Sequence, residues 1–527
     1  MILLSGCQCT KASSFEVSSD QSPIRNVIDD NYRNYYQIFV SSFADSNQDG
    51  IGDLRGIISK LEFLSDMGYT GIYLTPIFLS SSYHKYDIKD YFTIVPSFGT
   101  MEDLKELVSK AHSLDMKVIL DGVFNHSSIN HPYFEKALLA HQKKLQGLTL
   151  SEDEDYYEKL YVLIDDKSEM KSNRKYSKAG ANDFYYECNF STEMPEFDFE
   201  NESVYSLIQS IVDYYMSDDI KVDGFRLDAV LYYDYMNTSE NIKILNRIAK
   251  MVHDHDGYVI GECFSDEKTI TEYYQSDVDS FFYFPGQGMN GFINQSLGFM
   301  GDNKKKYLNG LEDMVRESGE HIPACFLDNH DVPRLSKSGN KRMNKFLLGL
   351  RDMANGCTFN YYGDEIGMSS SNIDFSSDYQ DSNYRTHYYW DDDNHEMETS
   401  DPIHSLSQIE AYPAMESQAM DENSILNYEK KALSLRNRYP SIARGEILVS
   451  QKDSKINESD ETKLLVFDKK YQDERIRFVF NFSGYENESY DLDGLTLVDI
   501  LLSDTDETQE VSNGKLIIPP YCIALLK

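Results

Sequence analysis

Three acidic residues stand where short apolar segments of the chain end. They are Asp228, Glu262 and Asp331. Arg226 comes two positions before the first of them, and His126 and His330 also lie at such ends. A single acid in such a place is most often a helix cap or half of an ion pair. Carboxylates that are buried together raise one another's pKa values, so three of them beside a cation predict nucleophilic and acid/base chemistry.

Apolar segments between about residues 34 and 368 alternate with amphipathic helical ones. They are short and rich in Val, Ile, Phe and Tyr, which is typical of strands buried on both faces. These segments are 35–40, 71–78, 117–124, 221–230, 258–264, 280–284, 324–329 and 358–362. The pattern predicts an α/β fold, a (β/α)8 TIM barrel, in which catalytic groups lie at the C-terminal ends of the strands. A doubly wound open sheet is the alternative that periodicity leaves open.

The chain of 527 residues is long enough for several domains. We expect a polar tether (1–30), a first part of the barrel (31–126), an inserted subdomain after the third strand (127–200), a second part of the barrel (201–440) and a C-terminal domain (441–527). The insertion far exceeds a βα loop, which has about two to six residues. Alternating apolar residues from Ile476 to Phe482 predict that the last part is an antiparallel β-sandwich domain.

Four segments at the predicted strand ends resemble, in order and separation, the sequence regions of the α-amylase family of retaining glycoside hydrolases. They are 121–126, 224–229, 261–262 and 328–331. Further similar segments are 71–78, 84–87, 194–198 and 361–367. The resemblance covers about residues 34–385, and it implies an enzyme that acts on α-glucans.

By this resemblance Asp228 is the nucleophile, Glu262 the general acid/base and Asp331 the stabiliser of the transition state. In this chemistry one carboxylate attacks the anomeric carbon, a carboxylic acid protonates the leaving oxygen, and water then releases the glycosyl-enzyme. We expect Arg226 to keep the nucleophile ionised and oriented. An apolar setting formed by residues such as Val259, Ile260 and Phe264 is expected to hold the proton on the acid.

The resemblance also assigns residues to the substrate. Those on the sugar before the scissile bond are Tyr86, His126 and His330. Many α-amylases carry Lys-His shortly after the nucleophile, where these two residues contact the leaving-group sugars. This chain has Leu231 and Tyr232 there, so we expect stacking by Tyr232 to replace hydrogen bonding.

The segment 45–53 offers oxygen atoms at alternate positions, and Gly50 allows it to turn sharply. The ligands would be the side chains of Asp45, Asn47, Asp49 and Asp53 and the carbonyl group of Ile51. Ca²⁺ prefers such oxygen ligands. An EF-hand is excluded because its bidentate Glu would fall on Gly56. A similar loop binds structural Ca²⁺ in many relatives, so Ca²⁺ is the expected cofactor; an Asp/Asn turn without metal is the alternative.

These features together predict an extracellular hydrolase that cleaves the α-1,4 bonds of starch or maltooligosaccharides. Ala229, directly after Asp228, is similar to family members that act on α-1,4 bonds. An exo-acting α-glucosidase or a glucanotransferase would use the same machinery. A non-catalytic glucan-binding or transporter-associated protein is the remote alternative, since such relatives lose members of the triad.

The chain is strongly acidic, with 88 Asp and Glu against 50 Lys and Arg and a net charge of −38. Such a surface repels phosphate backbones, so nucleic acid is not an expected partner. The start Leu3-Leu-Ser-Gly-Cys7 resembles the lipobox of bacterial lipoproteins, and a Ser-rich polar stretch follows it. We expect a monomer that is anchored at the bacterial cell surface through a lipid on Cys7 and has no other membrane contact.

Overall fold

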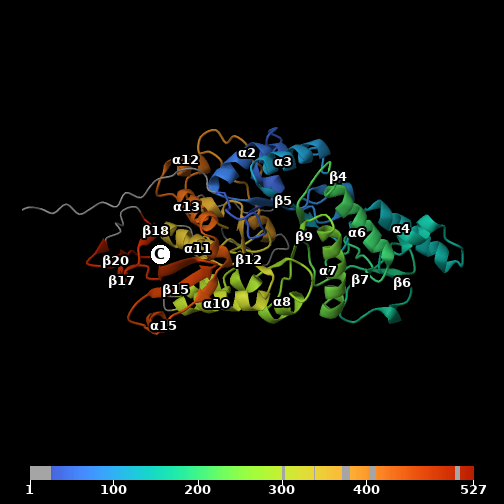
Figure 1. The fold of residues 1–527 in the computed structure, drawn as a ribbon. Helices are drawn as coiled ribbons and strands as arrows, with labels where there is room; N and C mark the ends of the chain where they lie inside the picture. Colours follow the sequence, from blue (N-terminus) through green and yellow to red (C-terminus); the bar gives the residue numbers. More distant parts are fainter. Residues whose placement is uncertain (1–24, 299–302, 337–338, 371–379, 403–410, 505–510) are drawn as a thin grey trace, which may run out of the picture.

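The computed structural model describes residues 25–298, 303–336, 339–370, 380–402, 411–504 and 511–527. At its centre is a closed barrel of parallel strands in the order β1-β13-β12-β11-β10-β9-β5-β2 (Figure 1). They are β1 (Asn34–Ile38), β2 (Gly71–Leu74), β5 (Lys117–Gly122), β9 (Gly224–Leu227), β10 (Tyr258–Gly261), β11 (Ser280–Phe282), β12 (Ile322–Phe326) and β13 (Cys357–Tyr361). The barrel prediction is confirmed, and the open sheet is wrong because each of these strands pairs with two neighbours and none is an edge strand.

Helices surround this barrel. The longer ones are α2 (Leu54–Met67), α3 (Met101–Ser113), α6 (Glu202–Tyr215), α7 (Thr238–His253), α8 (Glu267–Tyr273), α10 (Lys304–Ser318), α11 (Lys341–Asp352) and α13 (Ile425–Arg438). Helix α2 begins where the side chain of Asp53 accepts a hydrogen bond from the Gly56 N–H, and it ends at Gly68 with φ +104°. Its apolar stripe faces the barrel and is buried, as the spacing predicts.

Shorter helices lie between these elements. They are α1 (Val40–Phe43), α9 (Phe292–Leu297), α12 (Met415–Met420) and α14 (Pro440–Arg444). None of the helices in the described ranges has both the length and the apolar character needed to cross a bilayer.

Aromatic rings fill the barrel interior. Tyr35 stacks on Phe359 at 4.8 Å between ring centroids and on Tyr258 at 5.8 Å. Phe359 contacts Phe282 at 4.7 Å and Tyr73 at 6.3 Å, edge to face in both cases. Each ring buries a large apolar area, so this packing fixes the strands that carry the acidic residues.

Two insertions extend the barrel at the C-terminal ends of its strands. The hairpin of β3 (Phe78–Ser80) and β4 (Ile88–Ile94) follows β2. The predicted subdomain follows β5, on the right of Figure 1, and holds α4 (Pro132–Leu145), α5 (Glu152–Glu158) and a small sheet. The sheet has the order β6 (Leu163–Ile164), β8 (Tyr185–Glu187), β7 (Tyr176–Lys178). A bridge between His126 and Glu196 joins this subdomain to the end of β5.

The C-terminal part consists of antiparallel sheets, as predicted. One sheet has the order β14 (Glu446–Leu448), β15 (Leu464–Tyr471), β16 (Glu474–Asn481), β21 (Ile523–Leu526), β18 (Leu497–Leu501). The other has the order β17 (Glu488–Asp491), β20 (Lys515–Ile518), β19 (Val511–Ser512), and α15 (Gln451–Glu458) packs beside β15. Phe480 and Phe482 contact Tyr307 and Phe346 of the barrel helices, so this face of β16 is buried against the barrel.

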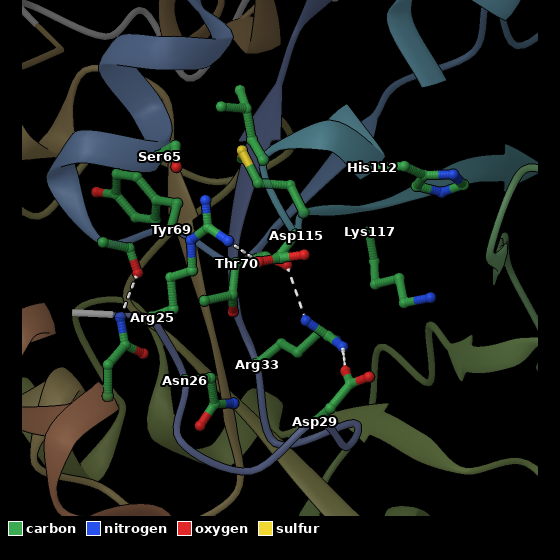
Figure 2. Close-up of a pocket in the computed structure, with 14 residues that line it drawn as sticks. Arg25, Asn26, Asp29, Arg33, Ser65, Tyr69, Thr70, His112, Asp115 and Lys117 are labelled. Atoms are coloured by element: carbon green, nitrogen blue, oxygen red, sulfur yellow. Dashed lines mark hydrogen bonds and ion pairs between the residues drawn. The ribbon is translucent and has the colours of Figure 1, made fainter. Parts of the chain in front are cut away.

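A polar cavity of about 380 Å³ lies at the N-terminal ends of β1, β2 and β5, opposite the ends that carry the acids (Figure 2). Arg33 pairs with Asp29 there, and Arg25 pairs with Asp115. This end of such a barrel typically serves stability. The predicted anchor residue Cys7 and most of the tether lie outside the described residues.

Candidate active site

One buried arginine joins the acidic residues at the C-terminal end of the barrel. Nη1 of Arg226 lies 2.6 Å from Oδ1 of Asp228 and 2.8 Å from Oδ1 of Asp121. Its Nη2 lies 2.8 Å from Oε2 of Glu262. The arginine is 2% exposed, so a single cation offsets three carboxylates in a nearly dry setting.

Strand register brings these groups together. Arg226 lies opposite Asp121 of β5 and Ile260 of β10, and its strand ends one residue before Asp228. Ala229 then turns sharply, with φ +50°. Its N–H donates to Oε2 of Glu262 at 3.0 Å. The short strands of a closed barrel therefore fix both predicted catalytic carboxylates on backbone that has little freedom.

Burial governs the protonation of the two acids. It raises the pKa of Glu262 to about 8, although Arg226 opposes the shift. Burial also raises the pKa of Asp228, and Arg226 again opposes it. Arg226 therefore favours the ionised form of Asp228, as expected, but desolvation is the larger effect on its pKa.

The expected apolar shell of Glu262 is partly wrong. Val259 and Ile260 are buried, but 55% of the Phe264 surface is exposed. The chain leaves the barrel after β10, and the Phe264 ring lies 4.5 Å from the Phe284 ring, between centroids, at an interplanar angle of 58°. The setting that favours the protonated acid comes from the barrel interior and not from Phe264.

Asp331 has a different environment. Its Oδ2 lies 3.1 Å from Nε2 of His330, and its Oδ1 lies 2.9 Å from Nη2 of Arg385. Desolvation raises the pKa of Asp331, but His330 and Arg385 outweigh it, so the pKa lies below the ordinary value of an aspartate. Asp331 is therefore ionised at pH values where Glu262 still holds its proton.

His330 and Tyr86 form a second connection across the site. The Tyr86 hydroxyl lies 2.6 Å from Nε2 of His330 and donates to Oδ2 of Asp121 at 2.9 Å. Gln37 Nε2 lies 2.8 Å from Nδ1 of His330. Burial lowers the pKa of His330 to about 3, so the imidazole is neutral and, with Gln37 donating to Nδ1, carries its hydrogen on Nε2.

His126 and Tyr232 lie on another side of the site. His126 is 2% exposed, and its Nε2 has no hydrogen-bond partner among the described residues. Burial lowers its pKa to about 4. A neutral buried ring with an unused nitrogen suits a sugar hydroxyl. Tyr232 is partly buried, and its ring centroid lies 4.2 Å from that of Phe190.

Sequence reasoning gave no role to several residues that the structure brings into the site. They are Asp121, Tyr73, Arg385 and Phe190. Tyr73 donates to Oδ2 of Asp121 at 2.6 Å, which leaves that carboxylate fully paired. Asp121 and Tyr73 lie within the segments 121–126 and 71–78, which are similar to the family, and this similarity is the signal that could have found them.

The predicted calcium loop is a series of side-chain-stabilised turns. Asp45 accepts hydrogen bonds from the N–H groups of Asn47, Gln48 and Gly50. Gly50 has φ +86°, and a Cβ there would lie 2.6 Å from Oγ of Ser400, so a glycine is required. Among the described residues, no group of three or more His, Cys, Asp or Glu side chains that could hold a metal is found.

The remaining loop residues add oxygen donors. Asn47 Oδ1 accepts from the Asp49 N–H, and Asp49 Oδ1 accepts from the Ile51 N–H. Asp53 is the N-cap of α2, and its carboxylate also accepts from Ser46. The donor set is all oxygen, which suits a hard cation, and a carboxylate has more acceptor sites than these turns use.

Carboxylates around a buried arginine, at the C-terminal end of a (β/α)8 barrel, define a glycoside-processing barrel enzyme. Residues 37–445 match the family described as alpha amylase, catalytic domain. The chain belongs to the α-amylase family of glycoside hydrolases, whose members hydrolyse or transfer α-glucans.

Similar proteins cover nearly the whole chain. Alpha-amylase 3 of Dictyoglomus thermophilum is 32% identical over 94% of this chain and 93% of its own length. The oligo-1,6-glucosidase of Bacillus cereus is 27% identical over 86% of this chain and 90% of its own. The solved structure of Eubacterium rectale Amy13B has a TM-score of 0.84 and 31% identity, covering 95% of this chain and 96% of that one.

The pKa of Glu262 is directly measurable. An infrared difference spectrum between the parent protein and Glu262→Gln should contain the band of a protonated carboxyl group. The band should disappear as the pH rises through about 8, because the carboxyl is neutral below its pKa and ionised above it. A midpoint near 4.5, the ordinary value, would contradict the burial effect.

Proposed function

We propose that this enzyme hydrolyses the α-1,4 bonds of starch or maltooligosaccharides by double displacement through a glycosyl-enzyme on Asp228. The observation that carries the proposal is the contact of one Arg226 side chain with both Asp228 and Glu262. Arg226 thereby holds the nucleophile Asp228 and the acid Glu262, whose pKa is raised, at the ends of the adjacent strands β9 and β10. A retaining mechanism uses such a pair of carboxyl groups.

In the first step an oxygen of Asp228 attacks the anomeric carbon while Glu262 gives its proton to the glycosidic oxygen. The bond between that carbon and that oxygen breaks, and the leaving sugar departs with a free hydroxyl group. Arg226 contacts both carboxylates, so it offsets charge on Asp228 before the attack and on Glu262 after the proton has moved. Asp331, ionised beside Arg385, stabilises the positive charge on the distorted sugar.

In the second step Glu262, now ionised, takes a proton from a water molecule. The water oxygen bonds to the anomeric carbon, the ester bond to Asp228 breaks, and the aspartate leaves as a carboxylate. His126 and His330 are neutral, so they can hydrogen-bond sugar hydroxyls without adding charge. The Tyr86 hydroxyl is engaged by Asp121 and His330, which leaves the ring face to stack on the sugar.

An exo-acting α-glucosidase or a glucanotransferase would use the same residues, because water and a sugar hydroxyl attack the same intermediate. The oligo-1,6-glucosidase among the relatives shows that cleavage of other bonds occurs with this fold. Ala229 after the nucleophile favours α-1,4 action by resemblance. A non-catalytic glucan-binding or transporter-associated protein is disfavoured because the chain keeps all three acids.

A product time course decides among these functions. The parent protein should release maltooligosaccharides from amylose and from maltotriose or longer chains, and it should leave isomaltose intact. Asp228→Asn should lower kcat/KM by about 10⁴-fold or more while the protein still folds, as judged by its circular dichroism spectrum. Asp218→Asn, a change of an exposed acid, is the matched control. Turnover by Asp228→Asn close to that of the control would contradict the nucleophile assignment.

We propose further that segment 45–53 binds Ca²⁺ through the oxygen atoms of Asp45, Asn47, Asp49, Ile51 and Asp53. Support comes from the all-oxygen donor set and from the position of the loop. Asp45 donates its N–H to the carbonyl of Met397, and Ser400 donates to the carbonyl of Gly50. A bound cation would therefore fasten the start of α2 to the segment that follows Trp390 and would contribute stability, not chemistry.

Removal of the metal tests this site. Exhaustive chelation should lower the melting temperature by several degrees, and Ca²⁺ but not Mg²⁺ should restore it. Asp49→Asn should reduce the difference between the chelated and the Ca²⁺-loaded protein, because it removes one charge from the site and keeps a similar shape. An unchanged melting curve after elemental analysis has verified metal removal would contradict the proposal.

We propose that the protein is an extracellular monomer held at the cell surface by a lipid on Cys7. Support comes from the lipobox-like start and from Arg25, which lies in the cavity at the N-terminal end of the barrel (Figure 2). A tether that leaves from there would direct the catalytic end away from a membrane.

Cells fed labelled fatty acid should incorporate label into the parent chain and not into Cys7→Ser; equal labelling would exclude this attachment site.

A further inference from the structure

We propose that Phe190 and Tyr232 together form the surface that binds the leaving-group sugar, and that Arg174 positions this aromatic pair. The inference rests on the proposed function. Phe190 belongs to the inserted subdomain, and 42% of its surface is exposed, which is unusual for a ring of this size. Its centroid lies 4.2 Å from the Tyr232 ring at an interplanar angle of 40°.

The aromatic pair lies on the acid side of the catalytic centre. Tyr232 donates its N–H to the carbonyl of Ala229, whose own N–H donates to Oε2 of Glu262. The Phe190 ring also lies 5.5 Å from the His126 ring. Since Glu262 protonates the oxygen of the leaving sugar, that sugar has to lie beside the segment that carries Tyr232.

The chemistry of the pair suits a pyranose ring. A glucose unit presents axial C–H groups on its faces and hydroxyl groups at its edge. An exposed aromatic face therefore binds the sugar by burying apolar area without placing a new charge near Glu262, whose raised pKa depends on a dry environment. Because the pair replaces the Lys-His contacts of many relatives, it should decide how well this enzyme uses a sugar as leaving group.

A buried polar network holds Phe190 in place. Asn189, the preceding residue, donates its N–H to Oε1 of Glu196 at 2.9 Å and its Nδ2 to Oε2 at 2.7 Å. The same Nδ2 lies 2.7 Å from Oε1 of Glu187, whose side chain is 1% exposed. These contacts fix the backbone of the loop and leave the Phe190 ring directed at Tyr232.

Arg174 links the two members of the pair across the boundary between the insertion and the barrel. Its Nη1 lies 3.1 Å from both carboxylate oxygens of Glu187. Its Nη2 pairs with Asp234, two residues after Tyr232. The arginine side chain is 10% exposed, so this link is shielded from solvent and salt. Arg174 is thus a positioning residue that sets the distance between Phe190 and Tyr232.

Two substrates that differ in their leaving group isolate the contribution of Phe190 to binding of the leaving-group sugar. Maltopentaose has a sugar as leaving group, whereas α-maltotriosyl fluoride releases fluoride and needs no sugar on that side. Phe190→Ala should lower kcat/KM for maltopentaose about tenfold and change that for the fluoride less than twofold, as expected for an aromatic contact of about 1.4 kcal/mol. Phe190→Trp should restore activity on maltopentaose. Leu139→Ala, which truncates an exposed side chain of α4, is the matched control.

Substitution of Asp234, the partner of Arg174, tests the positioning role of Arg174. Asp234→Asn breaks the ion pair with Arg174 and keeps the shape of the side chain, so it should show the same preference for the fluoride with a smaller loss on maltopentaose. Adding Asp234→Asn to Phe190→Ala should cause little further loss, because both changes act through the same contact.

The outcomes are distinct. Equal losses on both substrates, or no loss on maltopentaose in Phe190→Ala, would overturn the inference, since either result gives Phe190 no part in leaving-group binding. Full additivity of the two changes would overturn the role of Arg174. If the parent protein cleaves neither substrate, it is the proposed function that fails.

Discussion

The active-site end of the barrel depends on the guanidinium group of Arg226, which lies among Asp121, Asp228 and Glu262. A buried cation carries a large desolvation penalty, and these contacts repay it only while their geometry is kept. Removing one partner from such a cluster typically costs about 3–5 kcal/mol, because charge is left unpaired. The contacts of Arg226 therefore depend on the register in which β5, β9 and β10 pair.

The surroundings of Glu262 and of Asp331 give these two carboxyl groups opposite pKa shifts. The carboxyl group of Glu262 contacts Nη2 of Arg226 and is desolvated, and its pKa is raised to about 8. Asp331 lies outside the cluster, 34% of its side chain is exposed, and His330 and Arg385 lower its pKa. One carboxyl group can thus donate a proton while another keeps its charge, and the environment alone makes the difference.

The sequence was sufficient to predict the barrel and the position of the three acids at strand ends, because apolar strands and their ends have a local signature. It did not predict Arg385, which lies 54 positions after Asp331 and meets it only in the folded chain. The insertion has no periodic pattern, so neither its small sheet nor Phe190 could be placed. The expectation for Phe264 was wrong because an apolar residue type does not say whether a loop turns inward.

The central claim is that Asp228 and Glu262 act in sequence around one arginine, and trapping the covalent intermediate tests it most directly. In Glu262→Gln, α-maltotriosyl fluoride should still glycosylate the enzyme, since fluoride leaves without protonation, but no base remains to activate water. The intermediate should accumulate, and peptide mass mapping should find the maltotriosyl group on Asp228. A sugar on Asp331, or rapid turnover of the fluoride with no trapped ester, would contradict the account.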